Sequence, residues 1–172
     1  LQYAASASAL AATGTIPGSI ARAFAAEEGK RVIPWKNWSG GQSCTPSMRV
    51  APSDEAELAK VIVESAAPIR AVGAGHSFSG LVPTEGTLLS LDRMSGLVRA
   101  DAAAGRATFK AGTRLGATGA ALAENGLALE NMPDINKQTI AGAISTATHG
   151  TGSDIGSLST FVEGMRLMTA SG

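Results

Sequence analysis

A glycine-rich turn with a histidine in its middle is the stretch of this sequence best suited to chemistry. Residues 70–80 read RAVGAGHSFSG, in which an apolar run ends at Val72 and only small residues follow before His76. Small residues let a backbone approach a ligand closely, and consecutive exposed N–H groups form a nest for an anion, usually a phosphate. The stretch alone therefore fits a phosphate-binding turn as well as an ordinary strand and turn with an incidental histidine.

Two common phosphate-binding motifs do not fit this turn. The dinucleotide fingerprint G-x-G-x-x-G would need glycine where Phe78 stands, and the P-loop would need lysine where Leu81 stands. The turn follows a predicted strand but belongs to neither motif.

A second glycine-rich stretch, TIAGAISTATHGTG, covers residues 139–152. Nearly every side chain in it is small, hydroxyl groups recur, and no amphipathic period marks a face for a core. Such a segment can lie flat against a large ligand and donate from backbone N–H and hydroxyl groups. The alternative is a small-residue helix packed in the core, which would leave the clustered hydroxyl groups without a purpose.

The composition excludes several classes of protein. The 172 residues carry 14 basic and 14 acidic side chains, so nothing indicates binding to nucleic acid or to an anionic membrane. Cys44 is the only cysteine, which rules out an intramolecular disulfide. With only two histidines beside it, no Cys/His zinc site can be assembled, and we expect no metal.

The beginning of the chain resembles part of a secretory signal. Residues 1–25 carry no charge before Arg22 and end in a small-x-small pattern. We therefore expect an exported or periplasmic protein, with a cytoplasmic protein that has an N-terminal extension as the alternative. Pro17 and neighbouring glycines interrupt the apolar run, so we expect no transmembrane span. Residues 26–45, with Trp35 and Trp38, are predicted to form an extended, partly packed arm.

A strand–helix–strand unit is predicted to position the first turn. A strand at residues 47–51 precedes a helix with Ser53 as its N-cap, and this helix ends before Pro68. A strand at residues 69–72 then leads into the turn. The two strands are expected to be parallel, which places the turn at a carboxyl end, where open α/β sheets bind ligands.

The rest of the chain is predicted to add strands and one long helix. Further strands are expected at residues 87–91, 97–100, 108–111 and 162–169, the middle two forming a hairpin. Thr113 is expected to cap a helix that runs to about Asn125 and stops at Gly126.

Taken together and in this order, the two glycine-rich stretches resemble the FAD-binding domain of the vanillyl-alcohol-oxidase-type (PCMH-type) flavoproteins. The closer similarity is to sugar-1,4-lactone oxidases and dehydrogenases, which act on gulono-, galactono- or arabinonolactone, and to alditol oxidases. The segments that carry the resemblance are AVGAGHSFSG (71–80), LLSLDRM (88–94), NMPDINKQTIAGAISTATHGTG (131–152) and GSLSTFVEGMRLMTASG (156–172). Together they cover about residues 46–172.

The resemblance implies an α+β fold of two α/β subdomains with FAD between them. Residues 46–112 would form the first subdomain and residues 113–172 the beginning of the second. In the family the second subdomain continues, and a separate cap domain supplies most substrate contacts and the catalytic base. We therefore expect the missing C-terminal polypeptide to be a partner, and no catalytic residue is assigned here.

The resemblance also implies which residues bind FAD. From the first stretch these are Val72, Gly73, Ala74, Gly75, His76, Ser77, Phe78 and Ser79, which would wrap the pyrophosphate. From the second they are Pro133, Thr139, Gly142, Ser145, Thr146, Thr148, His149 and Gly150. His76 stands where many members bind the flavin covalently through its 8α-methyl carbon. Pro133 matches a position near flavin C4a–N5 where proline or small residues tend to accompany oxidases and alanine tends to accompany dehydrogenases.

The function implied is oxidation of an alcohol carbon of a sugar lactone or polyol, by hydride transfer to flavin and then to oxygen. A dehydrogenase of the same family that passes electrons to a quinone or cytochrome is the first alternative. The second, from another class, is a non-catalytic module whose glycine-rich turns bind some other phosphate ligand.

Overall fold

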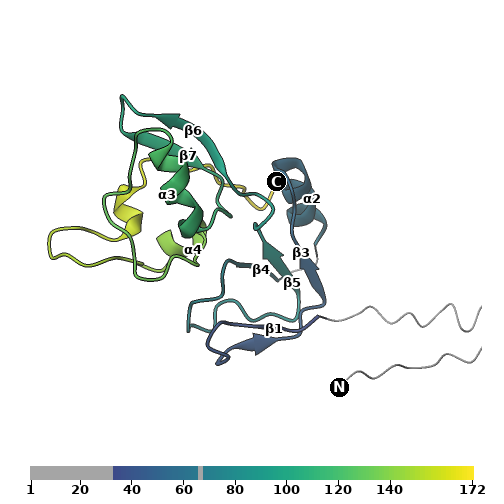
Figure 1. Ribbon diagram of the computed structural model, residues 1–172. Helices are drawn as coiled ribbons and strands as arrows, with labels where there is room; N and C mark the ends of the chain where they lie inside the picture. Colours follow the sequence, from purple (N-terminus) through teal and green to yellow (C-terminus); the bar gives the residue numbers. More distant parts are fainter. Residues whose placement is uncertain (1–32, 66–67) are drawn as a thin grey trace, which may run out of the picture. The chain divides into compact units, whose positions relative to one another are not determined.

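The computed structural model describes residues 33–65 and 68–172 (Figure 1). The described residues belong to one compact unit, Val32–Gly172. The signal-like segment predicted at residues 1–25 and the start of the arm lie outside them. Export therefore stays a prediction. The boundary between subdomains near residue 112 also stays a prediction.

A parallel sheet of three short strands carries the first glycine turn. Its strands are β3 (Met48–Val50), β4 (Ile69–Val72) and β5 (Thr87–Ser90). Their spatial order is β3-β5-β4, and β5 pairs in parallel with both neighbours. The predicted unit is confirmed, except that its two strands do not pair with each other because β5 lies between them. The first three residues of β5 are all buried, as a central strand requires.

Helix α2 (Glu55–Glu64) connects β3 to β4 and begins one residue later than predicted. Its N-cap is Asp54, whose Oδ1 accepts from the backbone N–H of Glu57 at 2.8 Å. Ser53, predicted as the cap, instead donates its backbone N–H and its hydroxyl to the Glu57 carboxylate, at 2.7 and 2.8 Å. These two hydrogen bonds stabilise the ionised carboxylate and lower the pKa of Glu57.

Two antiparallel hairpins flank the sheet in the chain. The first joins β1 (Trp35–Lys36) to β2 (Ser43–Cys44), so the arm turns back on itself and is not extended as predicted. The second joins β6 (Leu97–Asp101) to β7 (Arg106–Phe109), which confirms the predicted hairpin with β7 starting two residues early.

Helix α3 (Leu115–Ala123) follows, but Thr113 does not cap it as predicted. The N-cap position belongs to Arg114, which makes no side-chain capping bond. Thr113 is buried, and its hydroxyl donates to the Lys110 carbonyl oxygen at 2.6 Å and accepts from the Gly96 N–H at 2.9 Å. It therefore fixes the loop before the helix. Gly126 ends the helical region with a left-handed φ of 68°, as predicted.

The last third of the chain packs around a small apolar cluster. It contains helix α4 (Ile140–Ile144) and the 3-10 helix η1 (Leu158–Phe161). Leu115, Ala143 and Leu158 form the buried centre of the cluster. Among the described helices none is long and apolar enough to cross a membrane, and the described acidic, histidine and cysteine side chains form no metal-binding group.

The strand predicted at residues 162–169 is wrong. The segment has no regular structure, and Met165 and Leu167 are 63% and 75% exposed. A strand is stable only when its backbone groups pair with a neighbour, and no described strand lies beside this one. Its charged side chains form exposed ion pairs, including one of 2.9 Å between Arg166 and Glu55.

Gly112 provides a test of how the loop between β7 and α3 packs against the segment that follows β5. It is buried, and a Cβ atom there would collide with the carbonyl oxygen of Leu91. We expect Gly112→Ala to lower the free energy of unfolding by about 3 kcal/mol or more, because backbone atoms would have to move. Gly119 in α3 is the control, since a Cβ there meets nothing within 4 Å. Gly119→Ala should raise stability by about 0.5–1 kcal/mol. Denaturant unfolding measures both, and equal effects would contradict this packing.

Candidate cofactor-binding site

The first glycine turn leaves the carboxyl end of β4 and exposes a row of backbone donors. Within the described residues, no acceptor is found for the backbone N–H groups of residues 73–78. Gly75 has a left-handed φ of 69°, the conformation that lets consecutive N–H groups point to one side. The turn therefore has the geometry of an anion-binding nest.

Donors of the β1–β2 hairpin bind the carbonyl groups of this turn. The backbone N–H of Trp38 donates to the Gly75 carbonyl oxygen at 2.8 Å, and Nδ2 of Asn37 donates to that of Ser77 at 3.0 Å. Nε2 of Gln42 donates to the Phe78 carbonyl oxygen at 3.3 Å. These arm residues were not predicted to belong to the site, because their bonds to the turn join segments 36 to 40 residues apart.

The imidazole of His76 stacks on the indole of Trp38. The ring centroids are 5.1 Å apart and the planes differ by 18°. The hydroxyl groups of Ser77 and Ser79, predicted to contact the pyrophosphate, hydrogen-bond to each other at 2.9 Å on the surface. Phe78 is 69% exposed, so its side chain does not pack in the core.

A pocket of ≈ 230 Å³ opens at the carboxyl edge of the parallel sheet. It is lined by Arg49, Val50, Ala51, Val72, Leu88, Ser90 and Asp92. Ligand pockets in proteins usually measure about 300–1,000 Å³, so this one takes only part of a dinucleotide. The pocket lies at the carboxyl ends of the parallel strands, where the sequence analysis expects a ligand.

The second glycine-rich stretch meets the first at Gly73 and Thr139. A Cβ atom at Gly73 would lie 2.5 Å from Oγ1 of Thr139. Thr139 is 3% exposed, and its hydroxyl oxygen accepts from the Gly142 N–H at 3.1 Å. Residues 66 positions apart in the chain are thus in contact, and only glycine fits at position 73.

Most hydroxyl groups of the second stretch serve its own backbone. Ser145 donates to the Ala141 carbonyl oxygen at 2.8 Å, and Thr146 donates to that of Gly142 at 3.0 Å. Ala143, in the middle of α4, is fully buried. Residues 140–144 thus form a short helix whose middle residues are small, with one buried position, and the hydroxyl groups close its end.

Gln138 and Thr148 form a polar corner beside this helix. Nε2 of Gln138 donates to Oγ1 of Thr148 at 3.2 Å, and Thr148 contacts the hydroxyl of Thr146 at 3.1 Å. The other amide atom, Oε1 of Gln138, is buried and has no donor among the described residues. It is the one unsatisfied buried side-chain group among the described residues, and a buried acceptor without a partner costs about 1–3 kcal/mol.

The loop before Pro133 packs against Gly150. A Cβ at Gly150 would collide with the carbonyl oxygen of Met132 and the side chain of Asn131, and Nδ2 of Asn131 donates to the Thr151 carbonyl oxygen at 2.8 Å. Pro133 and Gly150, both predicted site residues, therefore belong to adjacent segments. His149 is exposed, and its Nδ1 bonds the Gly150 carbonyl oxygen at 2.8 Å.

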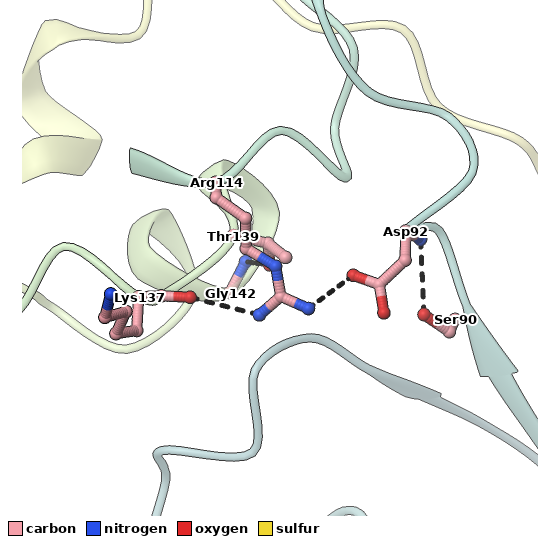
Figure 2. Close-up of polar contacts among 6 residues, drawn as sticks. All are labelled: Ser90, Asp92, Arg114, Lys137, Thr139 and Gly142. Atoms are coloured by element: carbon pink, nitrogen blue, oxygen red, sulfur yellow. Dashed lines mark hydrogen bonds and ion pairs between the residues drawn. The ribbon is translucent and has the colours of Figure 1, made fainter. Parts of the chain in front are cut away.

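Arg114 bridges the segment after β5 and the segment just before the second glycine-rich stretch (Figure 2). Nη2 of Arg114 lies 2.6 Å from Oδ1 of Asp92, and its Nη1 donates to the Lys137 carbonyl oxygen at 3.0 Å. Asp92 follows β5 and lines the pocket, whereas Lys137 lies two residues before Thr139. Neither Arg114 nor Asp92 was predicted as a site residue, because their contact joins segments that are 22 residues apart.

Residues 46–172 match a protein family described as "FAD binding domain". The chain belongs to this family of FAD-binding domains. The match covers the residues on which the resemblance was based and confirms it. FAD is thus the cofactor of the family to which the chain belongs.

Curated relatives of this FAD-binding domain are named for lactone oxidation. The "L-gulono-1,4-lactone dehydrogenase" of Mycobacterium tuberculosis is 43% identical over 141 residues, 80% of this chain and 33% of that protein. The "L-gulonolactone oxidase" of Mus musculus is 30% identical over 147 residues, 84% of this chain and 33% of that protein. The chain therefore spans about a third of the length of these relatives.

Solved structures confirm the fold. The FAD-binding domain matches a "Solvent-stable cholesterol oxidase" with a TM-score of 0.58 and 24% identity, over 70% of this chain and 24% of that one. At this identity the match shows the fold alone. The mixed helix and strand architecture is therefore part of the α+β FAD-binding fold that was predicted.

The described residues fit an FAD molecule. The open N–H groups of residues 73–78 fit a pyrophosphate, because an anion accepts from several backbone donors at once. Gly73 and Gly150 let backbone segments come close, and Gln138 offers a buried acceptor. The contacts of individual residues with FAD that the resemblance implies stay predictions.

A double-mutant cycle tests the contact between the two stretches. Gly73→Ala places a methyl group against Thr139 Oγ1 and should lower stability, by about 1–3 kcal/mol. Thr139→Ala removes both that oxygen and the cap of α4, and should lower stability by about 1 kcal/mol. The double variant should be more stable than the sum predicts, by about 0.5–3 kcal/mol, because the clash is gone. Strict additivity in denaturant unfolding would contradict the contact.

Proposed function

We propose that this chain is the FAD-binding part of a longer enzyme that oxidises an alcohol carbon of a sugar-1,4-lactone. The observation that carries the proposal is the meeting of the two glycine-rich stretches at Gly73 and Thr139, beside a turn with open N–H groups. The substrate class is supported by the relatives, which are named for gulono- and arabinonolactone. A polyol is the related alternative substrate.

In this proposal the chain's own residues bind and orient the cofactor. The N–H groups of residues 73–78 bind the pyrophosphate, and the segments at Pro133 and Thr139–Gly150 line the ring system. Bound FAD supplies the acceptor for the hydride that leaves the substrate carbon. We assign the substrate contacts and the proton acceptor to the part of the longer enzyme outside this chain.

We further propose that His76 is bonded to the cofactor. One imidazole nitrogen of His76 forms a bond to the 8α carbon of the flavin, and the imidazole N–H and one methyl C–H bond are broken. The two hydrogens pass through the flavin ring to dioxygen, which leaves as hydrogen peroxide, so the oxidised cofactor is restored. His76 supports this role because it lies in the middle of the open turn, next to the predicted pyrophosphate site.

Acid precipitation tests both FAD binding and the bond. The full chain should show flavin absorbance in the visible region, and its acid pellet should stay yellow. His76→Ala should give a colourless pellet with free FAD in the supernatant. Leu81→Ala is the control, because Leu81 is an exposed residue five positions after His76 and should leave the pellet yellow. A colourless pellet from the unchanged protein would contradict the bond, and a protein without visible absorbance would contradict FAD binding and favour a non-catalytic phosphate-binding module.

The electron acceptor is proposed to be oxygen, on the basis of Pro133. A dehydrogenase that reduces a quinone or cytochrome is the second candidate, favoured by the name of the relative from Mycobacterium tuberculosis. Aerobic turnover of a lactone should form one hydrogen peroxide for each lactone oxidised. Pro133→Ala should slow reoxidation by oxygen more than reduction of a dye, whereas Asp134→Ala at the exposed neighbour should change neither. Dye reduction without peroxide would establish the dehydrogenase.

A further inference from the structure

We propose that Trp38 is a positioning residue that holds the imidazole of His76 in the orientation needed for attachment to the flavin. This inference rests on the proposed bond between His76 and the cofactor. It is drawn from the arrangement of the β1–β2 hairpin around the turn and from the stacking of the two rings.

The backbone of His76 is fixed on both sides by neighbouring residues of the arm. The Gly75 carbonyl oxygen, before His76, accepts from the Trp38 N–H at 2.8 Å. The Ser77 carbonyl oxygen, after it, accepts from Nδ2 of Asn37 at 3.0 Å. Asn37 is 4% exposed, and its Oδ1 accepts from the Gln42 N–H at 3.0 Å, so the donor is itself held in place. The position of the His76 Cα is therefore determined by the arm.

The side chain of His76 is fixed by the indole of Trp38. A centroid distance of 5.1 Å with planes at 18° is an offset-stacked pair, a favourable arrangement for aromatic rings. Trp38 is 67% exposed, whereas Trp35, three residues earlier, is 8% exposed and packs against Gly75. Burial in the core accounts for a large apolar side chain at Trp35, but it does not account for one at the exposed position of Trp38. The contact with His76 is what the Trp38 side chain contributes.

Stacking suits a nucleophile of this kind. The lone pair of a neutral imidazole nitrogen lies in the plane of the ring, so an indole on the face of the ring leaves both nitrogens accessible. Stacking also restricts rotation of the side chain, which raises the fraction of molecules in one reactive orientation. Trp38 is thus expected to speed bond formation without touching the reacting atoms.

The rate of flavin attachment tests the proposal. Apoprotein of the full chain is mixed with FAD in air, samples are denatured over time, and protein-bound flavin fluorescence is measured. Trp38→Leu, which keeps apolar bulk without an aromatic face, should attach flavin several-fold to about tenfold more slowly, as expected for an aromatic pair. Trp38→Phe keeps a stacking face and should stay close to the unchanged protein. Leu81→Ala is the control, since Leu81 lies five residues after His76 and is about as exposed as Trp38.

A second measurement reads the stack without any flavin. In apoprotein with His149→Asn, His76 is the only imidazole, and its ring hydrogens should show an upfield NMR shift from the indole ring current. Trp38→Leu should abolish the shift. An unshifted His76 signal, attachment by Trp38→Leu as fast as normal, or a loss in Trp38→Phe as large as in Trp38→Leu would overturn the proposal. Absence of any bond in the unchanged protein would instead overturn the proposed function.

Discussion

The lack of a side chain at Gly73 is the constraint on which the site depends. A methyl group there would lie 2.5 Å from Oγ1 of Thr139, so the two glycine-rich stretches approach each other only because this position is glycine. Thr139 is a firm support, because it is buried, caps α4 and forms a bridge with Arg114. Arg114 in turn bonds Asp92 beside the pocket. Sheet edge, turn and second stretch are therefore one connected structure.

The polar groups of the first turn are divided between two sides. Its carbonyl oxygens at Gly75, Ser77 and Phe78 accept from donors of the β1–β2 hairpin. Its N–H groups have no acceptor among the described residues and stay available. A backbone segment carries as many acceptors as donors, so binding the carbonyl side to the protein leaves a surface that attracts anions. The hairpin thus leaves the N–H side of the turn open for the pyrophosphate that it is proposed to bind.

The sequence predicted the elements that depend on local patterns. The turn after β4, the β6–β7 hairpin and the stop at Gly126 follow from small residues, alternation and backbone conformation, which are local properties. The errors concern contacts between distant residues. Thr113 was taken as a helix cap, but its hydroxyl bonds a loop 17 residues away. The strand expected at residues 162–169 needs a neighbour that its own sequence does not reveal, and the support from Asn37 joins segments 40 residues apart.

The central place of β5 has a consequence for how the chain is assembled. Strands β3 and β4 come first in the chain, yet each pairs only with β5, which is made later. A ribosome-bound chain that ends before Thr87 therefore has no parallel sheet, and the strand that leads into the glycine turn has no partner until β5 is inserted between two strands already made. Thr139 emerges later still. The proposed cofactor site is therefore complete only after most of this chain has been translated. A shorter, stalled product would expose the unpaired edges of β3 and β4, which favours aggregation.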